Sequence, residues 1–221
     1  MLLRQSRYVL GVAVALLCCT GISAQEPWTI TFDQAPANTA PAGFSLAAMR
    51  QSDAGRWVVQ EDETGRFLVH RADPNAPGYA LAVAEQSTPD DLIAAVRLRM
   101  QGGTRTGGLV WRYEDHRNYY TLLLDLDRSE LSVYRITEGN RVLLDRRDEL
   151  ELDPVAWHAL KVIHIGNEIR VMLGGVRVFD ERDRRADRRS SGVGRVGVVA
   201  TGTSEICFDD LHVDTKRGHR P

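Results

Sequence analysis

Cysteine, lysine and long apolar runs are all scarce in this sequence. The 221 residues include three cysteines and two lysines, Lys161 and Lys216, against 26 arginines. Beyond residue 24 no stretch stays apolar over the roughly 20 residues that a membrane-spanning helix needs. The formal net charge of −2 provides no basic excess of the kind that nucleic-acid-binding domains carry. We therefore expect no nucleic-acid partner and no membrane span in the mature chain.

The N-terminus has the features of a secretory signal peptide. Arg4 and Arg7 form a positive segment, residues 8–19 form a short apolar segment, and residues 20–24 offer a cleavage site after Ala24. Residues 1–24 are therefore predicted to be a signal peptide, and the mature protein to be secreted or periplasmic. Lipidation at Cys18 or Cys19 is the alternative, but the small residue that should precede a lipidated cysteine is missing before both.

Removal of this leader would leave Cys207 as the one remaining cysteine, so the mature chain cannot form an intramolecular disulfide. Its stability must then come from burial of apolar surface, for which 43% hydrophobic residues suffice. Cys207 lies in the apolar sequence Glu-Ile-Cys-Phe. It is predicted to be a small buried hydrophobe and not a reactive thiol.

From Trp28 onward the apolar residues recur at every second position, which is the period of β-strands. Strands are expected at residues 28–32, 56–60, 66–70, 79–84, 92–100, 107–113, 119–126, 130–136, 141–144, 157–165, 168–173, 176–180, 193–200 and 205–213. Turn sequences such as Gly102-Gly103 and Gly174-Gly175 separate them. Short strands at this spacing predict an all-β fold, with two antiparallel sheets packed as a sandwich over residues 25–214. Residues 181–192 are expected to form a surface loop, and residues 215–221 a flexible tail.

Several segments resemble those of bacterial concanavalin A-like, or laminin-G-like, jelly rolls. They are Gly107–Tyr113, Asn118–Tyr120, Trp157–Val162, Gly166–Val171, Gly194–Gly197 and Phe208–Val213. The branch that the chain resembles most is the secreted domain known as 3-keto-disaccharide hydrolase, which is similar in fold to family 16 glycosidases. The resemblance covers roughly residues 28–214. It implies a jelly roll with one concave sheet and carbohydrate as the commonest class of ligand, while fold alone does not give function.

A glycosidase needs two carboxyl groups that face each other across a cleft. Family 16 enzymes carry them as Glu-x-Asp-x-x-Glu, and the nearest match here is the segment Asp125–Glu130. This segment has Asp at the first position, and Arg128-Ser129 stands where the family strand is apolar. Residues 127–129 are therefore predicted to form a hairpin turn, in preference to a catalytic set.

The metal and cofactor signals are weak. The six histidines show no spacing typical of a zinc site, so no cofactor is expected. A structural calcium held by Asp209, Asp210 or Asp33 would suit a jelly roll of this kind. Capping of strand ends by the same carboxylates is the favoured alternative.

The best candidate binding site follows from alternation within residues 92–136, which we expect to form a four-strand meander. Tyr120, Leu122, Leu124 and Leu126 share the expected core face. The opposite face would present the candidate ligand-binding residues Arg97, Arg99, Arg112, Tyr119, Asp125 and Tyr134. Aromatic rings stack on sugar C–H groups, while arginine and carboxylate groups pair with hydroxyls, so this face suits a glycan platform. A solvated face with cross-strand arginine–aspartate pairs explains the same residues at least as well.

The sequence thus predicts an exported all-β jelly-roll sandwich that interacts with a glycan or oligosaccharide and has weak catalytic activity or none. Two alternatives stay open at this stage. One is a 3-keto-glycoside hydrolase, as the resemblance implies, and the other is a protein-interaction module of the laminin-G type.

Overall fold

The computed structural model describes residues 26–48, 55–72, 78–183, 193–203 and 205–214, which form fifteen β-strands and no helix. None of these residues therefore belongs to a helix that could cross a membrane. The predicted signal peptide at residues 1–24 and the predicted tail at residues 215–221 lie outside the described residues.

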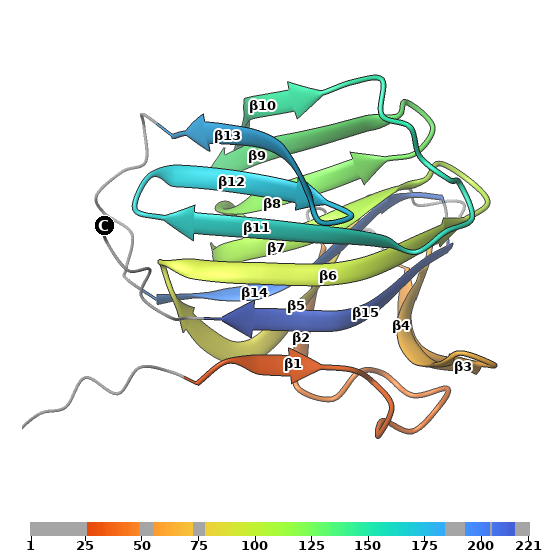
Figure 1. Cartoon of the computed structure of the whole chain (residues 1–221). Helices are drawn as coiled ribbons and strands as arrows, with labels where there is room; N and C mark the ends of the chain where they lie inside the picture. Colours follow the sequence, from red (N-terminus) through yellow and green to blue (C-terminus); the bar gives the residue numbers. More distant parts are fainter. Residues whose placement is uncertain (1–25, 49–54, 73–77, 184–192, 204, 215–221) are drawn as a thin grey trace, which may run out of the picture.

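The strands form two antiparallel sheets that pack face to face (Figure 1). Sheet A has the order β13 (Val176–Arg182), β12 (Glu168–Leu173), β11 (His158–Ile165), β6 (Leu92–Gln101), β15 (Glu205–Asp214), β4 (Gly65–Arg71) and β3 (Arg56–Asp62), with β1 (Trp28–Ile30) paired to β15. Sheet B has the order β10 (Asn140–Arg147), β9 (Glu130–Thr137), β8 (Asn118–Asp125), β7 (Thr106–Asp115), β14 (Val193–Gly202), β5 (Gly78–Pro89) and β2 (Phe44–Ala48). The fold is the two-sheet jelly-roll sandwich that the sequence predicts.

The core lies between the sheets and is built from alternate residues of each strand. On β8 the side chains of Tyr120, Leu122 and Leu124 point into this core, as predicted, and both leucines are fully buried. Trp111 of β7 and Phe208 of β15 are also buried there. Burial of each leucine contributes about 1.5–3 kcal/mol relative to exposure. Cys207 points to the outer side of sheet A, where it is buried as predicted, and burial raises the pKa of its thiol to about 11.

All fourteen predicted strands are present, and one strand was missed. The missed strand is β2, at the edge of sheet B next to β5. Its sequence Phe-Ser-Leu-Ala-Ala is short and alanine-rich, and Leu46 is 49% exposed, so the apolar period gives little signal. The predicted loop at residues 181–192 was wrong at its start, because β13 extends to Arg182 and Asp183 is buried.

The expected four-strand meander over residues 92–136 was also wrong in its first strand. β6 belongs to sheet A, whereas β7, β8 and β9 belong to sheet B, and the meander of sheet B continues into β10. Gly102 and Gly103 both have positive φ, at 60° and 56°, and they lie in the turn after β6. This turn carries the chain from one sheet to the other instead of closing a hairpin within one sheet.

Candidate functional site

The outer face of sheet B, which points away from the core, carries a second apolar cluster. Tyr119 lies in this cluster with Tyr113, Leu123 and Ile136, and its side chain is only 3% exposed. The rings of Tyr113 and Tyr119 are 5.7 Å apart, and burial raises the pKa of the Tyr119 hydroxyl well above its usual value. Alternation therefore placed Tyr119 on the correct face, but the expectation that it faces water was wrong. Tyr119 supports the surface instead of forming it.

The strand register brings five polar residues into one row across sheet B. Glu130 pairs with Asp125, Asp125 with Thr106, Thr106 with Thr201, and Thr201 with Tyr79. Residues that stand directly opposite each other in antiparallel strands point to the same face. The row therefore crosses β9, β8, β7, β14 and β5 on the outer face of the sheet.

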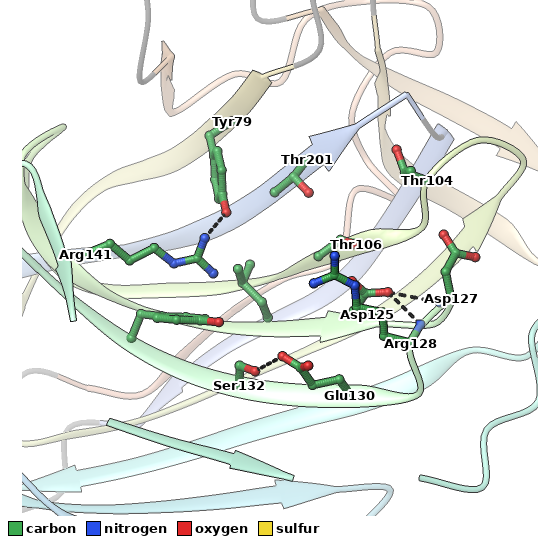
Figure 2. Close-up of a pocket in the computed structure, with 12 residues that line it drawn as sticks. Tyr79, Thr104, Thr106, Asp125, Asp127, Arg128, Glu130, Ser132, Arg141 and Thr201 are labelled. Carbon is green, nitrogen blue, oxygen red and sulfur yellow. Dashed lines mark hydrogen bonds and ion pairs between the residues drawn. The ribbon is translucent and has the colours of Figure 1, made fainter. Parts of the chain in front are cut away.

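A pocket of about 340 Å³ lies over this row, and Figure 2 shows the side chains that line it. Leu123 forms part of its floor. Leu123 belongs to the neighbouring row of outward-facing positions, in which Leu123 pairs with Gly108 and Gly108 with Val199. The middle position of this second row therefore has no side chain. A Cβ atom at Gly108 would lie 1.8 Å from the carbonyl oxygen of Leu122, so the backbone of β8 requires glycine there.

One end of the pocket is an arginine held between two tyrosines. The guanidinium of Arg141 lies 3.5 Å from the centroid of the Tyr134 ring and 5.7 Å from that of Tyr79. Arg141 also donates a hydrogen bond of 2.5 Å to the Tyr79 hydroxyl. Burial raises the pKa of this hydroxyl, so it stays protonated and accepts the bond as a neutral group. These contacts fix the plane of the guanidinium at the pocket wall.

The other end of the pocket is the turn between β8 and β9, which confirms that residues 127–129 form a hairpin turn. Asp125 accepts hydrogen bonds of 3.0 Å from the backbone N–H groups of Asp127 and Arg128. Asp127 accepts bonds of 2.9 and 2.8 Å from the backbone and side chain of Arg105. Burial opposes ionisation of Asp127, but these bonds outweigh it and lower the pKa.

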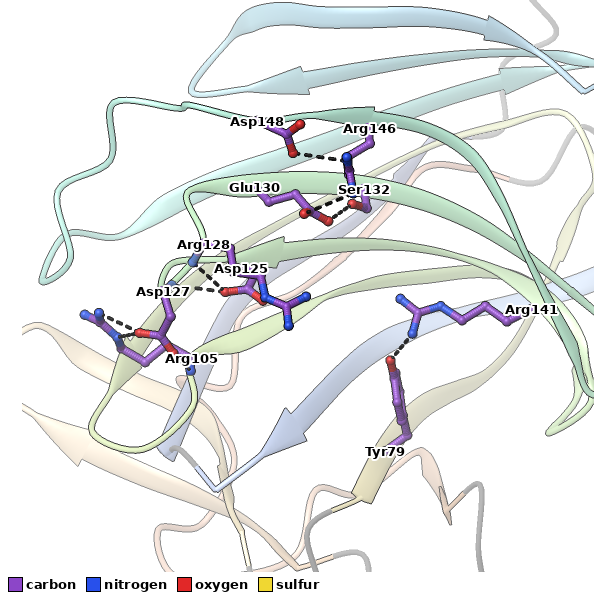
Figure 3. A network of polar contacts seen from close by, with 10 residues as sticks. All are labelled: Tyr79, Arg105, Asp125, Asp127, Arg128, Glu130, Ser132, Arg141, Arg146 and Asp148. Atoms are coloured by element: carbon purple, nitrogen blue, oxygen red, sulfur yellow. Dashed lines mark hydrogen bonds and ion pairs between the residues drawn. The ribbon is translucent and has the colours of Figure 1, made fainter.

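Glu130 completes the acidic lining. It accepts a hydrogen bond from the Ser132 hydroxyl and lies 3.8 Å from the Nη1 atom of Arg146, which in turn pairs with Asp148 (Figure 3). The three acidic residues of the lining therefore all have partners within the protein.

Arg97 and Arg99 do not join this pocket, because their strand lies in sheet A. On the outer face of that sheet Arg97 contacts the carboxylates of Asp209 and Asp210 at 2.9 and 2.6 Å. The guanidinium groups of Arg97 and Arg99 lie 5.4 and 4.9 Å from the Trp157 ring. The predicted single platform was therefore wrong, because its members lie on opposite faces of the sandwich.

The same contacts bear on the suggested calcium site. The Arg97 guanidinium already provides a cation to Asp209 and Asp210, and burial raises the pKa of Asp209. Over the described ranges no three His, Cys, Asp or Glu side chains converge as a metal site would require.

Arg112 is displaced from the outer face by a β-bulge. The register between β7 and β8 shifts after Trp111, and Arg112 has a φ of 47°. Its guanidinium donates hydrogen bonds of 2.9 Å to the carbonyl of Asp90 and 3.0 Å to that of Gly166. Arg112 therefore ties β7 of sheet B to the turn between β11 and β12 of sheet A. It is a structural residue and does not line the pocket.

Of the six predicted site residues, the pocket brings together Asp125 and Tyr134, with Tyr119 in the apolar cluster beside it. The lining residues outside the predicted set include Tyr79, Thr106, Arg128, Glu130, Arg141 and Thr201. Alternation along the strands places most of them on the same outer face as Asp125, and this alternation can be read from the sequence. Tyr79 and Thr201 could be joined to this site only with the pairing of β7, β14 and β5, whose order across the sheet does not follow the chain.

The sequence matches no protein-family model and no curated protein. The fold is similar to that of solved structures. The carbohydrate-binding module CBM66 from Bacillus subtilis is 16% identical, with a TM-score of 0.59 over 78% of this chain and 97% of that one. A Bacillus subtilis protein of unknown function with a galectin-like fold is 11% identical, with a TM-score of 0.56 over 85% and 98%. Domain 4 of AbnA, a GH43 extracellular arabinanase from Geobacillus stearothermophilus in complex with arabinotriose, is 11% identical, with a TM-score of 0.55 over 86% and 93%. These similarities establish the fold alone.

Proposed function

We propose that this chain is an exported carbohydrate-binding domain with little or no catalytic activity, and that the sugar binds in the pocket on the outer face of sheet B. The observation that carries the proposal is that the Tyr134–Arg141 stack and the polar row of sheet B line one pocket. A sugar ring offers apolar C–H groups to aromatic side chains and hydroxyls to guanidinium and carboxylate groups. This pocket supplies partners for both.

Two further observations support the proposal. Two structures of similar fold are a carbohydrate-binding module and a domain in complex with arabinotriose. The pocket volume of about 340 Å³ is within the range typical of small-molecule sites. Export is proposed from the sequence of residues 1–24, which has the features of a signal peptide.

The alternative is hydrolysis of a 3-keto-disaccharide, the activity of the family that the sequence resembles. The observation that favours it is that Asp125 and Glu130 stand directly opposite each other. Hydrolysis needs one carboxyl group to donate a proton. Here Asp125 accepts hydrogen bonds from two turn N–H groups and Glu130 accepts one from Ser132, so both carboxyl groups are already engaged by neighbouring groups of the chain. Binding without hydrolysis therefore suits this geometry better.

A laminin-G-like contact with a protein partner has less support. Such a contact would use an extended apolar patch on one face of a sheet. The exposed large hydrophobic side chains among the described residues are Leu46, Leu143, Val155, Val176 and Val193. Val155 lies between β10 and β11, and the other four lie on four different strands.

The proposal is tested on a glycan array with the purified protein and two variants. Tyr134→Ala removes the aromatic wall of the pocket. Trp157→Ala removes a partly buried aromatic side chain on the outer face of sheet A, where it contacts Arg97 and Arg99, and serves as the matched control. We expect the wild type to bind at least one saccharide and Tyr134→Ala to weaken that binding about two- to tenfold, in line with an aromatic contact of about 0.5–1.5 kcal/mol.

The control separates the two faces of the sandwich. Trp157→Ala should bind as the wild type does. Loss of binding in Trp157→Ala but not in Tyr134→Ala would move the site to sheet A, and no binding to any glycan would refute the proposed function. Release of products from a 3-keto-disaccharide, abolished in Asp125→Asn, would instead establish the hydrolase.

A further inference from the structure

The charges in the pocket are unevenly partnered. Asp127 is held by Arg105, Glu130 lies near Arg146, and Asp125 is bonded to the turn. Arg141 differs from the other arginines of this network, because no carboxylate of the described chain lies within ion-pair distance of it (Figure 3). Its neighbours are the Tyr79 hydroxyl and two aromatic rings.

Arg141 is also oriented before any ligand binds. The ring of Tyr134 packs against the face of the guanidinium, and the bond to Tyr79 fixes its rotation. A planar guanidinium held in one orientation loses little conformational freedom when it binds a carboxylate through two parallel hydrogen bonds. The remaining N–H groups of Arg141 are therefore ready for a planar anion.

A second arginine points to the same space. Arg128 extends from the turn between β8 and β9, and its guanidinium and that of Arg141 point toward one another across the pocket (Figures 2 and 3). The Nε atom of the Arg128 guanidinium lies 3.9 Å from the Asp125 carboxylate, so this ion pair is weak. An anion placed between the two guanidinium groups would be attracted by both.

The rest of the pocket favours hydroxyl groups. Asp125, Glu130, Thr106 and Thr201 provide oxygen atoms that accept hydrogen bonds from hydroxyls. Two carboxylates among them would repel a compact dianion such as phosphate. A ligand with one carboxylate and several hydroxyls at a distance from it matches both parts of the pocket.

We propose that the saccharide bound here is acidic, with a uronic acid residue whose carboxylate is held by Arg141 and Arg128. This inference rests on the proposed function, because it names the class of sugar that the same pocket takes. The hydroxyls of the uronic acid face the polar row of sheet B, and its ring lies over Leu123.

The test is an array on which each uronate-containing polysaccharide is printed beside its carboxyl-reduced form, which is neutral and otherwise identical. Dextran sulfate is included to separate carboxylate recognition from general attraction of polyanions. We expect binding to at least one uronate polysaccharide, with a reduced form that binds about tenfold more weakly or worse, since hydrogen bonds between two charged groups are stronger than those between neutral groups. Added salt should diminish the preference.

Arg141→Ala should remove the preference for the acidic form, and Arg141→Lys should restore part of it, because lysine keeps the charge but not the planar fork. Arg170→Ala, an exposed arginine of sheet A, is the matched control and should leave binding unchanged. Equal binding of the acidic and reduced forms would overturn this inference and leave the proposed function intact. Equal binding of dextran sulfate would also overturn it, whereas no binding to any saccharide would refute both.

Discussion

The Nη1 atom of Arg135 lies 2.8 Å from both carboxylate oxygens of Asp183, and the Tyr120 hydroxyl donates a 2.9 Å hydrogen bond to the same carboxylate. The side chains of Asp183 and Arg135 are 2% and 12% exposed. Arg135 belongs to β9 of sheet B, and Asp183 follows β13 of sheet A. The pair therefore links the two sheets through a buried charge contact.

Asp183→Ala should destabilise the fold by about 3–5 kcal/mol, because it leaves the Arg135 guanidinium buried without its carboxylate. Asp180→Ala is the matched control, since Asp180 belongs to the adjoining strand and pairs with Arg170 and Arg177 at the surface. The control should cost less than about 1 kcal/mol. Urea unfolding measures both free energies, and similar losses in the two variants would contradict a buried role for Asp183.

The histidine in the core should make the fold sensitive to acid. The Trp111 indole donates a 3.0 Å hydrogen bond to the Nδ1 atom of His164, and burial, with the nearby charge of Arg112, lowers the pKa of His164 to about 2. The unfolded chain takes up this proton near pH 6.5, and the folded chain does so only near pH 2. Stability is therefore fully present above pH 6.5 and is lost as the pH falls below it, by about 1.4 kcal/mol per pH unit.

The measurement is the free energy of unfolding in urea between pH 6.5 and 4.5. The fold lowers the pKa values of Asp62, Asp115 and Asp127. Their contribution to the free energy of unfolding falls only near and below pH 3.8, outside this window. His164→Gln keeps an acceptor for Trp111 but cannot take up a proton. It should show a clearly flatter pH dependence than the wild type, and parallel curves would argue against His164 as the cause.

Much of the fold was accessible from the sequence because strand alternation is local. In residues 120–126 the face of the sheet to which each side chain points follows from whether its number is odd or even. In β7 the bulge at Arg112 breaks this alternation, so Arg112 does not lie on the outer face where we expected it. Pairing between distant strands has no such local signal. The turn at Gly102 and Gly103 serves a crossover between sheets, yet the same dipeptide would also suit a hairpin. That ambiguity placed Arg97 and Arg99 on the wrong sheet.

The pocket was less accessible than the fold for the same reason. Asp125 and Tyr134 come from neighbouring strands of one meander, and alternation was enough to identify them. Tyr79 and Thr201 join them only through β14, which enters sheet B between β5 and β7. The burial of Tyr119 depends on Tyr113, which the bulge turns outward, so parity alone could not separate a supporting tyrosine from an exposed one.

The contact between Arg141 and Tyr134 should be measurable as a coupling energy. We consider a double-mutant cycle with Arg141→Ala and Tyr134→Leu. The loss of unfolding free energy in the double variant should differ from the sum of the two single losses by about 0.5–1 kcal/mol, which is typical of an exposed cation–π pair. The cycle uses urea unfolding of the wild type, both single variants and the double variant. A coupling energy of zero would show that Arg141 is not held by the ring and would weaken the case for an oriented guanidinium.

Gly108 should be the glycine of β7 that tolerates substitution least. A Cβ atom there would lie 1.8 Å from the carbonyl oxygen of Leu122 and 2.9 Å from its carbon, both in the backbone of β8, which cannot move without disrupting the β7–β8 ladder. Gly108→Ala should therefore cost about 3 kcal/mol or more, at or above the upper end of what overpacking usually costs. At Gly107 the nearest atom is the flexible end of the Ile206 side chain, at 2.9 Å, so Gly107→Ala is the matched control with the smaller loss. Thermal and urea unfolding compare the two, and equal losses would mean that β7 and β8 adjust to each other more freely than their spacing indicates.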